Sequence, residues 1–493
     1  GSAQRMLAFA LASFGAIARP AGTQAAVHRR ASASVLESAA VYTGASQAER
    51  LGVAQQWADG FSVLAAELGA PWQRRPLITH ALAPISQGFF TAQHLQRAVE
   101  SNFLDAGLGI FDARGSNGWQ MGRVGSPRGT SFEDAKLTWA EVQASLERGT
   151  VVFNYFGAHE KSLAQMCLGA VHAFGLPCNL NLYITRAGQP LSAPPHTDRQ
   201  DVLIVQTQGV KHWRVYAPPE PALRPGTDPL ARGKSSDRLE LCELGAPLLE
   251  VDLLPGQTLY IPAAFPHTTS TSEGGAAGQS EPSVHLTLNV DSHIWCLTYE
   301  AARKVALARV GEAPDGLDVR ALPLGEYLDW QDTLPVGFRS PSRSPSSAPA
   351  ADEAAAAAEA EATEVEGMAR SLAERACAAQ PGRWESADAA ASALELGACA
   401  RRLQQHYWEL LDVQRRLYLD SALELTPTPH SVSLFRVKPY LAELEGTMET
   451  LTAWANLPPG SLVGEPAAAA APVAKPAKAK PGKGKGKGKG FGG

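Results

Sequence analysis

A histidine and an aspartate stand two positions apart, His196 and Asp198, directly before the apolar run "DVLIVQTQG". Side chains of these types are costly to bury unless they are paired or bind a metal. At the mouth of a strand this spacing points both to the same side. A third candidate ligand, His267, follows another apolar run in "LYIPAAFPHTTS". Two histidines and one carboxylate can occupy one face of an octahedron, which suits Fe(II) and leaves positions open for a cosubstrate and O₂.

Each member of this set has a simpler alternative when it is taken alone. A single H-x-D pattern is a weak signal in a chain with 12 histidines. His196 could be a turn histidine before a strand, and His267 a loop residue after Pro266. Because all three residues stand at the ends of predicted strands, their combination favours a metal site.

A lysine next to this region points to an anionic ligand. In "GVKHWRVY", which follows the glycine turn at Gly209, alternation places Lys211 and Trp213 on one face and His212 and Arg214 on the other. A lysine that points inward beside large apolar side chains needs an anion, and a dicarboxylate would supply one. The alternative is a solvent-facing Lys211 together with an exposed His212.

The elements that must position these residues are short strands. "NLNLYIT", "DVLIVQTQG", "VKHWRVY", "PLLEVDLL", "QTLYIP" and "SVHLTLNV" are rich in β-branched and aromatic residues and are separated by Gly, Pro and polar turns. Such a series predicts an antiparallel jelly-roll barrel. In "SVHLTLNV" the polar residues Ser283, His285, Thr287 and Asn289 share one face, which fits a strand beside a cosubstrate pocket. We assign His285 to the pocket wall, because a fourth protein ligand would occupy a position that the chemistry needs.

The order of these motifs resembles the Jumonji C (JmjC) oxygenases. An N-x-Y strand, H-x-D, a lysine after a glycine turn, a distal histidine after "LYIP" and then "S-x-HLTL" follow one another as in that family. The pattern is most similar to the ribosomal-oxygenase branch, the histidyl hydroxylases that are also described as lysine-specific demethylases. The resemblance covers roughly residues 70–310 and opens at "PWQRRPLI".

The resemblance implies a set of roles for particular residues. His196, Asp198 and His267 would be the iron ligands and the catalytic centre, and Lys211 would bind the distal carboxylate of 2-oxoglutarate. Asn181, Tyr183 and Ser283 would line the same cosubstrate pocket. The implied cofactors are Fe(II), 2-oxoglutarate as cosubstrate and O₂, with ascorbate as the reductant in vitro.

The implied fold is mainly β with helical additions, a double-stranded β-helix (jelly roll, cupin-like) core followed by a C-terminal, mostly helical accessory domain. We divide the chain into 1–48, a disordered or transit-like N-terminus; 49–310, the oxygenase domain, with a helical N-terminal part and a barrel at about 150–295; 311–367, a connecting region with a Ser/Pro/Ala/Glu-rich linker; 368–458, the accessory domain; and 459–493, a disordered Lys/Gly-rich tail. Within the accessory domain, the alternating stretch "SVSLFRV" predicts a short strand.

The two ends and the cysteines bear on location and partners. No acidic residue occurs before Glu37, and the Arg/Ser/Ala composition there fits an organellar transit peptide or a plain disordered extension. From Ala467 onward the tail carries seven lysines and no acid, which suits contact with RNA or DNA, or solubility alone. The six cysteines form no C-x-x-C pair, which argues against a zinc finger or a disulfide scaffold. No apolar run is long enough for a membrane span.

Two classes of function remain. The first is a 2-oxoglutarate-dependent dioxygenase that hydroxylates a ribosomal-protein histidine or arginine, with histone lysine demethylation as a further activity that the resemblance implies. The second is a catalytically silent, cupin-like binding or scaffold module, since a fold does not determine function. The resemblance implies a nuclear or nucleolar location, with plastid or mitochondrion as the alternative, and a homodimer as one form of assembly.

Overall fold

The structure is a computed structural model that describes residues 52–101, 104, 106–110, 118–125, 136–220, 227–234, 236–311, 316–340, 353–425 and 433–457. The predictions for the N-terminal segment 1–48 and for the tail 459–493 lie outside these residues. Within the described part of the chain, no helix is long and apolar enough to cross a membrane.

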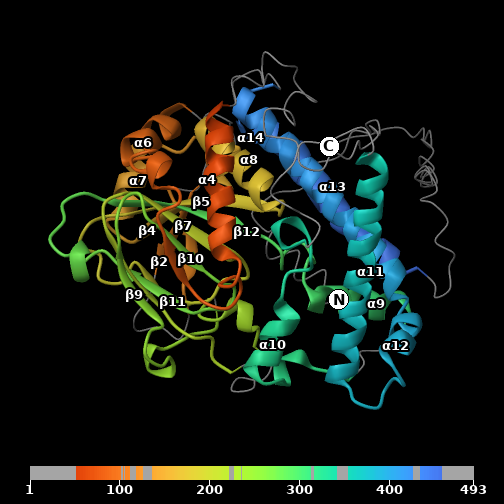
Figure 1. The fold of residues 1–493 in the computed structure, drawn as a ribbon. Coiled ribbons are helices and arrows are strands. Elements are labelled where there is room, and N and C mark those ends of the chain that lie inside the picture. Colours follow the sequence, from red (N-terminus) through yellow and green to blue (C-terminus); the bar gives the residue numbers. More distant parts are fainter. Residues whose placement is uncertain are drawn as a thin grey trace, which may run out of the picture.

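Two antiparallel sheets form the core, as the strand pattern predicts. The larger has the strand order β1-β10-β7-β12-β5-β4-β2-β3 and the smaller β6-β11-β8-β9. Figure 1 labels strands of both sheets. The strands are β1 (Leu77–Thr79), β2 (Gly107–Ile110), β3 (Gln120–Arg123), β4 (Thr150–Phe153), β5 (Cys178–Thr185), β6 (Ala193–His196), β7 (Asp201–Gln208), β8 (Lys211–Val215), β9 (Leu249–Leu253), β10 (Thr258–Ile261), β11 (His267–Ser270) and β12 (Ser283–Val290). The jelly-roll, cupin-like expectation is confirmed.

The N-terminal part is less helical than predicted. It contributes β1, β2 and β3 to the larger sheet, where β1 pairs with β10 and β2 with both β3 and β4. These strands escaped the sequence pattern because they are short, and because the edge strand β3 is exposed along its whole length. An exposed strand has no alternation of polar and apolar residues to reveal it.

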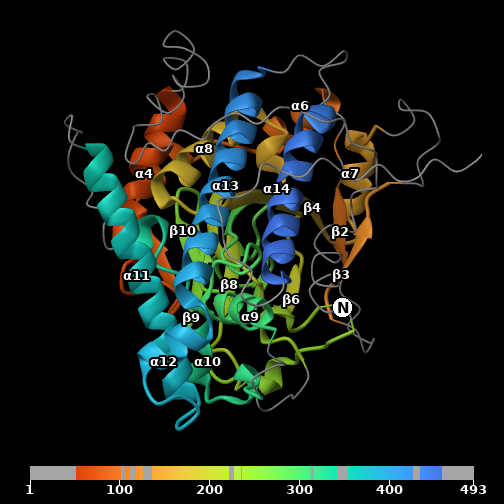
Figure 2. The ribbon, with the colours of Figure 1, turned by 90° about the vertical axis from the view of Figure 1, so that its right-hand side faces the viewer.

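Helices cover one side of the larger sheet. Figure 2 shows α4, α8, α13 and α14 side by side across it, with α11 packed beside α13. The helices are α4 (Gly52–Leu68), α5 (Ala83–Ser86), α6 (Ala92–Ser101), α7 (Trp139–Leu146), α8 (Lys161–Phe174), α9 (Tyr299–Arg309), α10 (Leu324–Gln331), α11 (Glu353–Ala379), α12 (Ala387–Ala393), α13 (Leu396–Leu423) and α14 (Ser433–Ala455).

The predicted linker and accessory domain need correction. The connecting region 311–367 contains α10 and the start of α11, which begins at Glu353 inside the predicted linker. Alanine and glutamate, which dominate that stretch, are strong helix formers. The predicted strand at "SVSLFRV" is also wrong where it is described, since α14 begins at Ser433.

The C-terminal helices are not a separate unit, because they share one apolar core with α4 and α8. Helix α13 also holds the start of the site strand β5. The Tyr418 hydroxyl donates to the Cys178 carbonyl at 2.6 Å, and the Cys178 amide donates to Gln414 Oε1 at 2.9 Å. The residues that the sequence assigns to an accessory domain therefore support the strand that carries Asn181 and Tyr183.

Candidate metal centre and cosubstrate pocket

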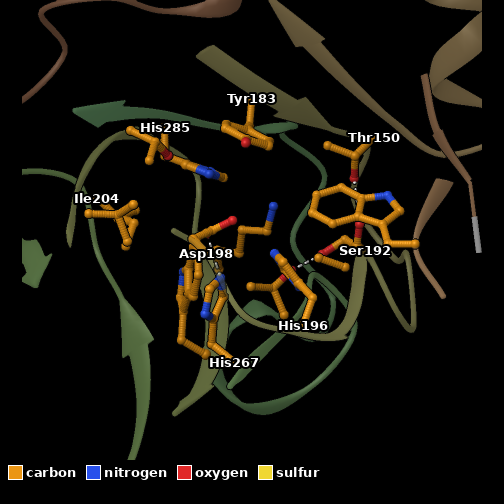
Figure 3. A pocket seen from close by; sticks show the side chains of 15 residues that line it. Thr150, Tyr183, Ser192, His196, Asp198, Ile204, His267 and His285 are labelled. Atoms are coloured by element: carbon orange, nitrogen blue, oxygen red, sulfur yellow. Dashed lines mark hydrogen bonds and ion pairs between the residues drawn. The ribbon is translucent and has the colours of Figure 1, made fainter. Parts of the chain in front are cut away.

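The three candidate metal ligands come together at one end of the smaller sheet. His196 ends β6 and His267 begins β11, and the two residues face each other in the antiparallel register of these strands. Asp198 follows β6 by two residues. One ligand atom from each side chain lies within 4.8 Å of the other two. Figure 3 shows the three side chains directed toward one another.

Backbone contacts set which nitrogen of each histidine faces the centre. Nδ1 of His196 lies 2.7 Å from the Pro194 carbonyl, and Nδ1 of His267 lies 3.1 Å from the Phe265 carbonyl. A carbonyl oxygen only accepts, so each Nδ1 carries the proton and each Nε2 presents a lone pair. His267 Nε2 is 3.5 Å from Asp198 Oδ2. The arrangement matches a two-histidine, one-carboxylate metal site.

The charge states of the three side chains also suit a divalent cation. Burial lowers the pKa of both His196 and His267, which keeps the imidazoles neutral. Burial alone would raise the pKa of Asp198, but the adjacent Lys234 cation lowers it well below its usual range. Two neutral imidazoles and one carboxylate are the protonation states that metal binding requires.

Lys211 lies inward, as the alternation predicts, and has no acidic partner among the described residues. Its side chain is 2% exposed. Its Nζ donates to Thr185 Oγ1 at 3.1 Å, and that hydroxyl lies 3.0 Å from Thr150 Oγ1, which donates to the Ser192 carbonyl at 2.9 Å. A buried ammonium held only by neutral groups is costly unless an anion binds beside it. The pocket therefore has the chemistry of a carboxylate site.

His212 occupies the opposite face of β8, so the solvent-facing alternative for Lys211 is wrong. Its ring nitrogens lie 2.7 Å from Asp252 Oδ1 and 3.1 Å from Glu250 Oε1, on the neighbouring strand β9. The sequence alternation of β8 is thus confirmed on both faces.

Burial of Lys211 predicts a pH dependence of stability. Burial lowers the pKa of Lys211 from 10.5 to about 7, so between these values the unfolded chain binds more protons than the folded one. The free energy of unfolding should therefore rise with pH across this window, and the penalty should be complete below about pH 7. Without metal or cosubstrate, Lys211→Met should have a higher free energy of unfolding in urea than wild type at pH 6.5, and this difference should shrink by pH 9. A difference that is the same at both pH values would contradict a lowered pKa of Lys211.

Two of the predicted cosubstrate residues do not line the cavity. Asn181 Oδ1 accepts from the Tyr155 amide at 3.0 Å, and Ser283 Oγ accepts from Gln206 Nε2 at 3.0 Å. Tyr183 does line it, with its ring stacked on His285 at a centroid distance of 4.9 Å. The cavity wall therefore includes Tyr183 with Lys211 and the triad, whereas Asn181 and Ser283 share the face of Tyr183 and His285 in the β5–β12 pairing without being part of the lining. The lining residues are Trp119, Thr150, Tyr183, Ser192, Ala193, His196, Asp198, Val202, Ile204, Lys211, Trp213, His267, Thr269, His285 and Thr287.

His285 remains outside the triad, in agreement with its expected place in the wall. Its Nδ1 is buried without a hydrogen-bond partner among the described residues. Burial, and then the nearby Lys211 cation, lower its pKa far below the usual value. A neutral imidazole with an unsatisfied nitrogen beside Lys211 is a second polar group available to a bound ligand.

Two residues of the site, Trp119 and Lys234, were not predicted from the sequence. The Trp119 ring lies edge-on to His196 at a centroid distance of 4.6 Å, and Lys234 pairs with Asp198. Neither residue belongs to a periodic segment, and each reaches the site across a long sequence separation. The one local signal near Lys234 in the sequence is the preceding residue, Gly233, which is typical of a turn.

Comparison with known proteins agrees with the geometry. A family model described as "JmjC domain" matches residues 159–291. Ribosomal oxygenase 2 of Bos taurus is 29% identical over 224 residues, covering 44% of this chain and 43% of the relative. The bifunctional lysine-specific demethylase and histidyl-hydroxylase NO66 of Aedes aegypti is 36% identical over 145 residues, covering 29% and 21%. The chain thus spans less than half the length of these relatives.

Among solved structures, the ribosomal oxygenase YcfD of Escherichia coli aligns with a TM-score of 0.30 and 15% identity, over 62% of this chain and 67% of that chain.

Proposed function

We propose that this chain, whose residues 159–291 match the family model described as "JmjC domain", is an Fe(II)- and 2-oxoglutarate-dependent dioxygenase that hydroxylates a side chain of a protein. The observation that carries the proposal is the shared cavity of a complete His196, Asp198, His267 triad and a buried ammonium, Lys211, without an acidic partner among the described residues. A silent scaffold would have no need for either.

The protein's own residues have separate tasks in this proposal. His196, Asp198 and His267 hold the metal, which when bound supplies the oxidation chemistry with 2-oxoglutarate and O₂. Lys211 binds the distal carboxylate of the cosubstrate, with Thr185 fixing the direction of the ammonium. Tyr183 flanks the cosubstrate, and the aromatic wall with Val202 and Ile204 excludes water from it.

Asn181 and Ser283 act on the cosubstrate through neighbours in this proposal. The Asn181 side chain accepts from the Tyr155 amide at 3.0 Å and so fixes strand β5 two residues before Tyr183. Ser283 accepts from Gln206, whose amide also donates to the Gln208 and Gly209 carbonyls at the turn that leads into Lys211. Both residues would orient groups that touch 2-oxoglutarate without touching it themselves.

The charges in the cavity favour a neutral substrate side chain. Among the described lining residues the only carboxylate is Asp198, which is already bound by Lys234. When a divalent metal and the 2-oxoglutarate dianion are bound, their charges cancel. The Asp198 carboxylate then offsets one of the two nearby ammonium groups, Lys211 and Lys234, so one positive charge remains uncompensated. Aromatic walls alone would suit a cation, but a guanidinium or a methylated ammonium would meet net positive charge here.

A ribosomal-protein histidine is therefore the preferred target, because a neutral imidazole can pack on Trp119 and Tyr183 without that repulsion. Arginine hydroxylation and histone lysine demethylation rank below it. A ribosomal-protein substrate would place the enzyme where ribosomes assemble or work, in the nucleus or nucleolus, or in a plastid or mitochondrion.

Matched peptides test the substrate class. Windows of ribosomal proteins would be synthesised with histidine, arginine or trimethyllysine at one central position and incubated with the Fe(II)-loaded protein, 2-oxoglutarate and air. We expect the histidine peptides alone to gain the mass of one oxygen. Oxidation of the arginine peptides, or loss of methyl groups from the lysine peptides, without histidine oxidation would contradict this substrate choice. Tight 2-oxoglutarate binding with no turnover at all would indicate the binding module instead.

A further inference from the structure

The loop segment 228–234 is hydrogen-bonded to Thr197, the residue that lies between two metal ligands. The Thr197 amide donates to the Arg232 carbonyl at 3.0 Å, and the Arg232 amide donates to Thr197 Oγ1 at 2.8 Å. The same hydroxyl donates to the Pro229 carbonyl at 3.0 Å. Since Thr197 separates His196 from Asp198, these three hydrogen bonds join the loop directly to the segment that carries two of the metal ligands.

Gly233 allows the loop to approach this closely. Its φ is +72°, and a Cβ at this position would lie 2.1 Å from the Pro195 carbonyl oxygen and 2.8 Å from the His196 Cα. Asp237 Oδ2 fixes the turn by accepting from the Gly233 amide at 2.7 Å and from Arg232 Nε at 2.9 Å. The backbone that carries the next residue, Lys234, is therefore held in one conformation.

This turn directs Lys234 to one oxygen of Asp198. Lys234 Nζ donates to Asp198 Oδ1, whereas Oδ2 is the oxygen 3.5 Å from His267 Nε2, on the side of the triad. On its other side the turn is paired with the pocket wall, since the Trp119 amide donates to the Gly233 carbonyl at 2.8 Å. The two carboxylate oxygens thus have different surroundings.

We propose that Lys234 is a positioning residue that holds Asp198 Oδ1 so that only Oδ2 is presented to the metal. The inference rests on the proposed function and concerns the same site. A carboxylate can bind a metal through one oxygen or through both. Binding through both would use a position that the cosubstrate or O₂ needs. By occupying Oδ1, Lys234 keeps that position open.

Cobalt(II) is the probe, because its visible absorption responds to the number and arrangement of its ligands. Wild type, Lys234→Met and Lys234→Arg would be loaded with Co(II) and titrated with 2-oxoglutarate. Arg199→Met is the matched control. Arg199 neighbours Asp198 in sequence, has a side chain 35% exposed as Lys234 does, and pairs with Asp228 of the same loop without touching a metal ligand.

In Lys234→Met we expect an altered Co(II) spectrum before any cosubstrate is added. We also expect a higher Kd for 2-oxoglutarate, by a factor similar to the roughly 10- to 100-fold loss of metal affinity or activity that follows removal of a partner of a metal ligand. Lys234→Arg should restore most of the affinity, and Arg199→Met should behave as wild type. A role in folding alone would lower the melting temperature without this pattern. If Lys234→Met does not fold, Lys234→Ala carries the same expectation.

The outcomes separate this inference from the proposed function. A wild-type protein that binds Co(II) and 2-oxoglutarate, with a Lys234→Met variant identical to it in spectrum and affinity, would overturn the role of Lys234 and leave the dioxygenase intact. A wild-type protein that binds neither would overturn the proposed function and this inference with it.

Discussion

Replacing His196 with alanine should abolish Fe(II) binding and 2-oxoglutarate turnover. His196 supplies one of three protein ligands, and even the loss of an outer partner of a ligand costs roughly 10- to 100-fold in metal affinity or activity. Loss of the ligand itself should therefore exceed about a hundredfold. The measurements are metal content after dialysis against Fe(II) or Mn(II), and succinate formed per hour.

His212→Ala is the matched control for this variant. His212 is also a buried histidine of the smaller sheet, but both of its ring nitrogens face carboxylates on the outer side. It should keep the metal and the turnover. A His196→Ala protein that still binds Fe(II) as wild type does would remove His196 from the ligand set.

Replacing Lys211 with methionine should leave metal binding intact and weaken 2-oxoglutarate strongly. Truncating one partner of a buried, hydrogen-bonded charge pair costs about 2–5 kcal/mol, at least roughly thirtyfold in affinity. Methionine keeps most of the side-chain volume, so the cavity should not collapse. The Kd for 2-oxoglutarate, measured by calorimetry on the Mn(II)-loaded protein, gives the effect directly.

Two further variants show whether the loss is specific to Lys211. Ser283→Ala and Asn181→Ala remove side chains that do not line the cavity and that bond to Gln206 and to the Tyr155 amide, so each should raise that Kd less than roughly tenfold. If either matches Lys211→Met, that residue contacts the cosubstrate itself. If Lys211→Met binds 2-oxoglutarate as wild type does, the carboxylate site lies elsewhere.

The triad and Lys211 could be predicted because each lies on or beside a strand with a clear pattern. Alternation decided that Lys211 and His212 occupy opposite faces, and antiparallel neighbours brought His196 opposite His267. Alternation predicts on which face of a strand a side chain lies, but not whether its position along the strand reaches the cavity. Ser283 shares a face with His285, yet it lies opposite Thr185 at the end of the pairing, beyond the cavity.

The helices show a different limit of sequence analysis. The Ala/Glu-rich stretch before residue 368 has the composition of a linker, and its high helix propensity was the signal that could have identified α11. No local pattern could show that α13 packs against α8, because tertiary packing between segments so far apart leaves no trace in periodicity. The hydrogen bond from Tyr407 to the Gly175 carbonyl, at 2.7 Å, spans 232 residues.

The most direct test of the central claim is the conversion of 2-oxoglutarate to succinate by the purified wild-type protein with Fe(II), ascorbate and air, measured alongside binding of Mn(II) and 2-oxoglutarate to the same sample. The dioxygenase account predicts that both ligands bind and that succinate accumulates only when Fe(II) and O₂ are present. A protein that binds neither Mn(II) nor 2-oxoglutarate and forms no succinate would contradict it.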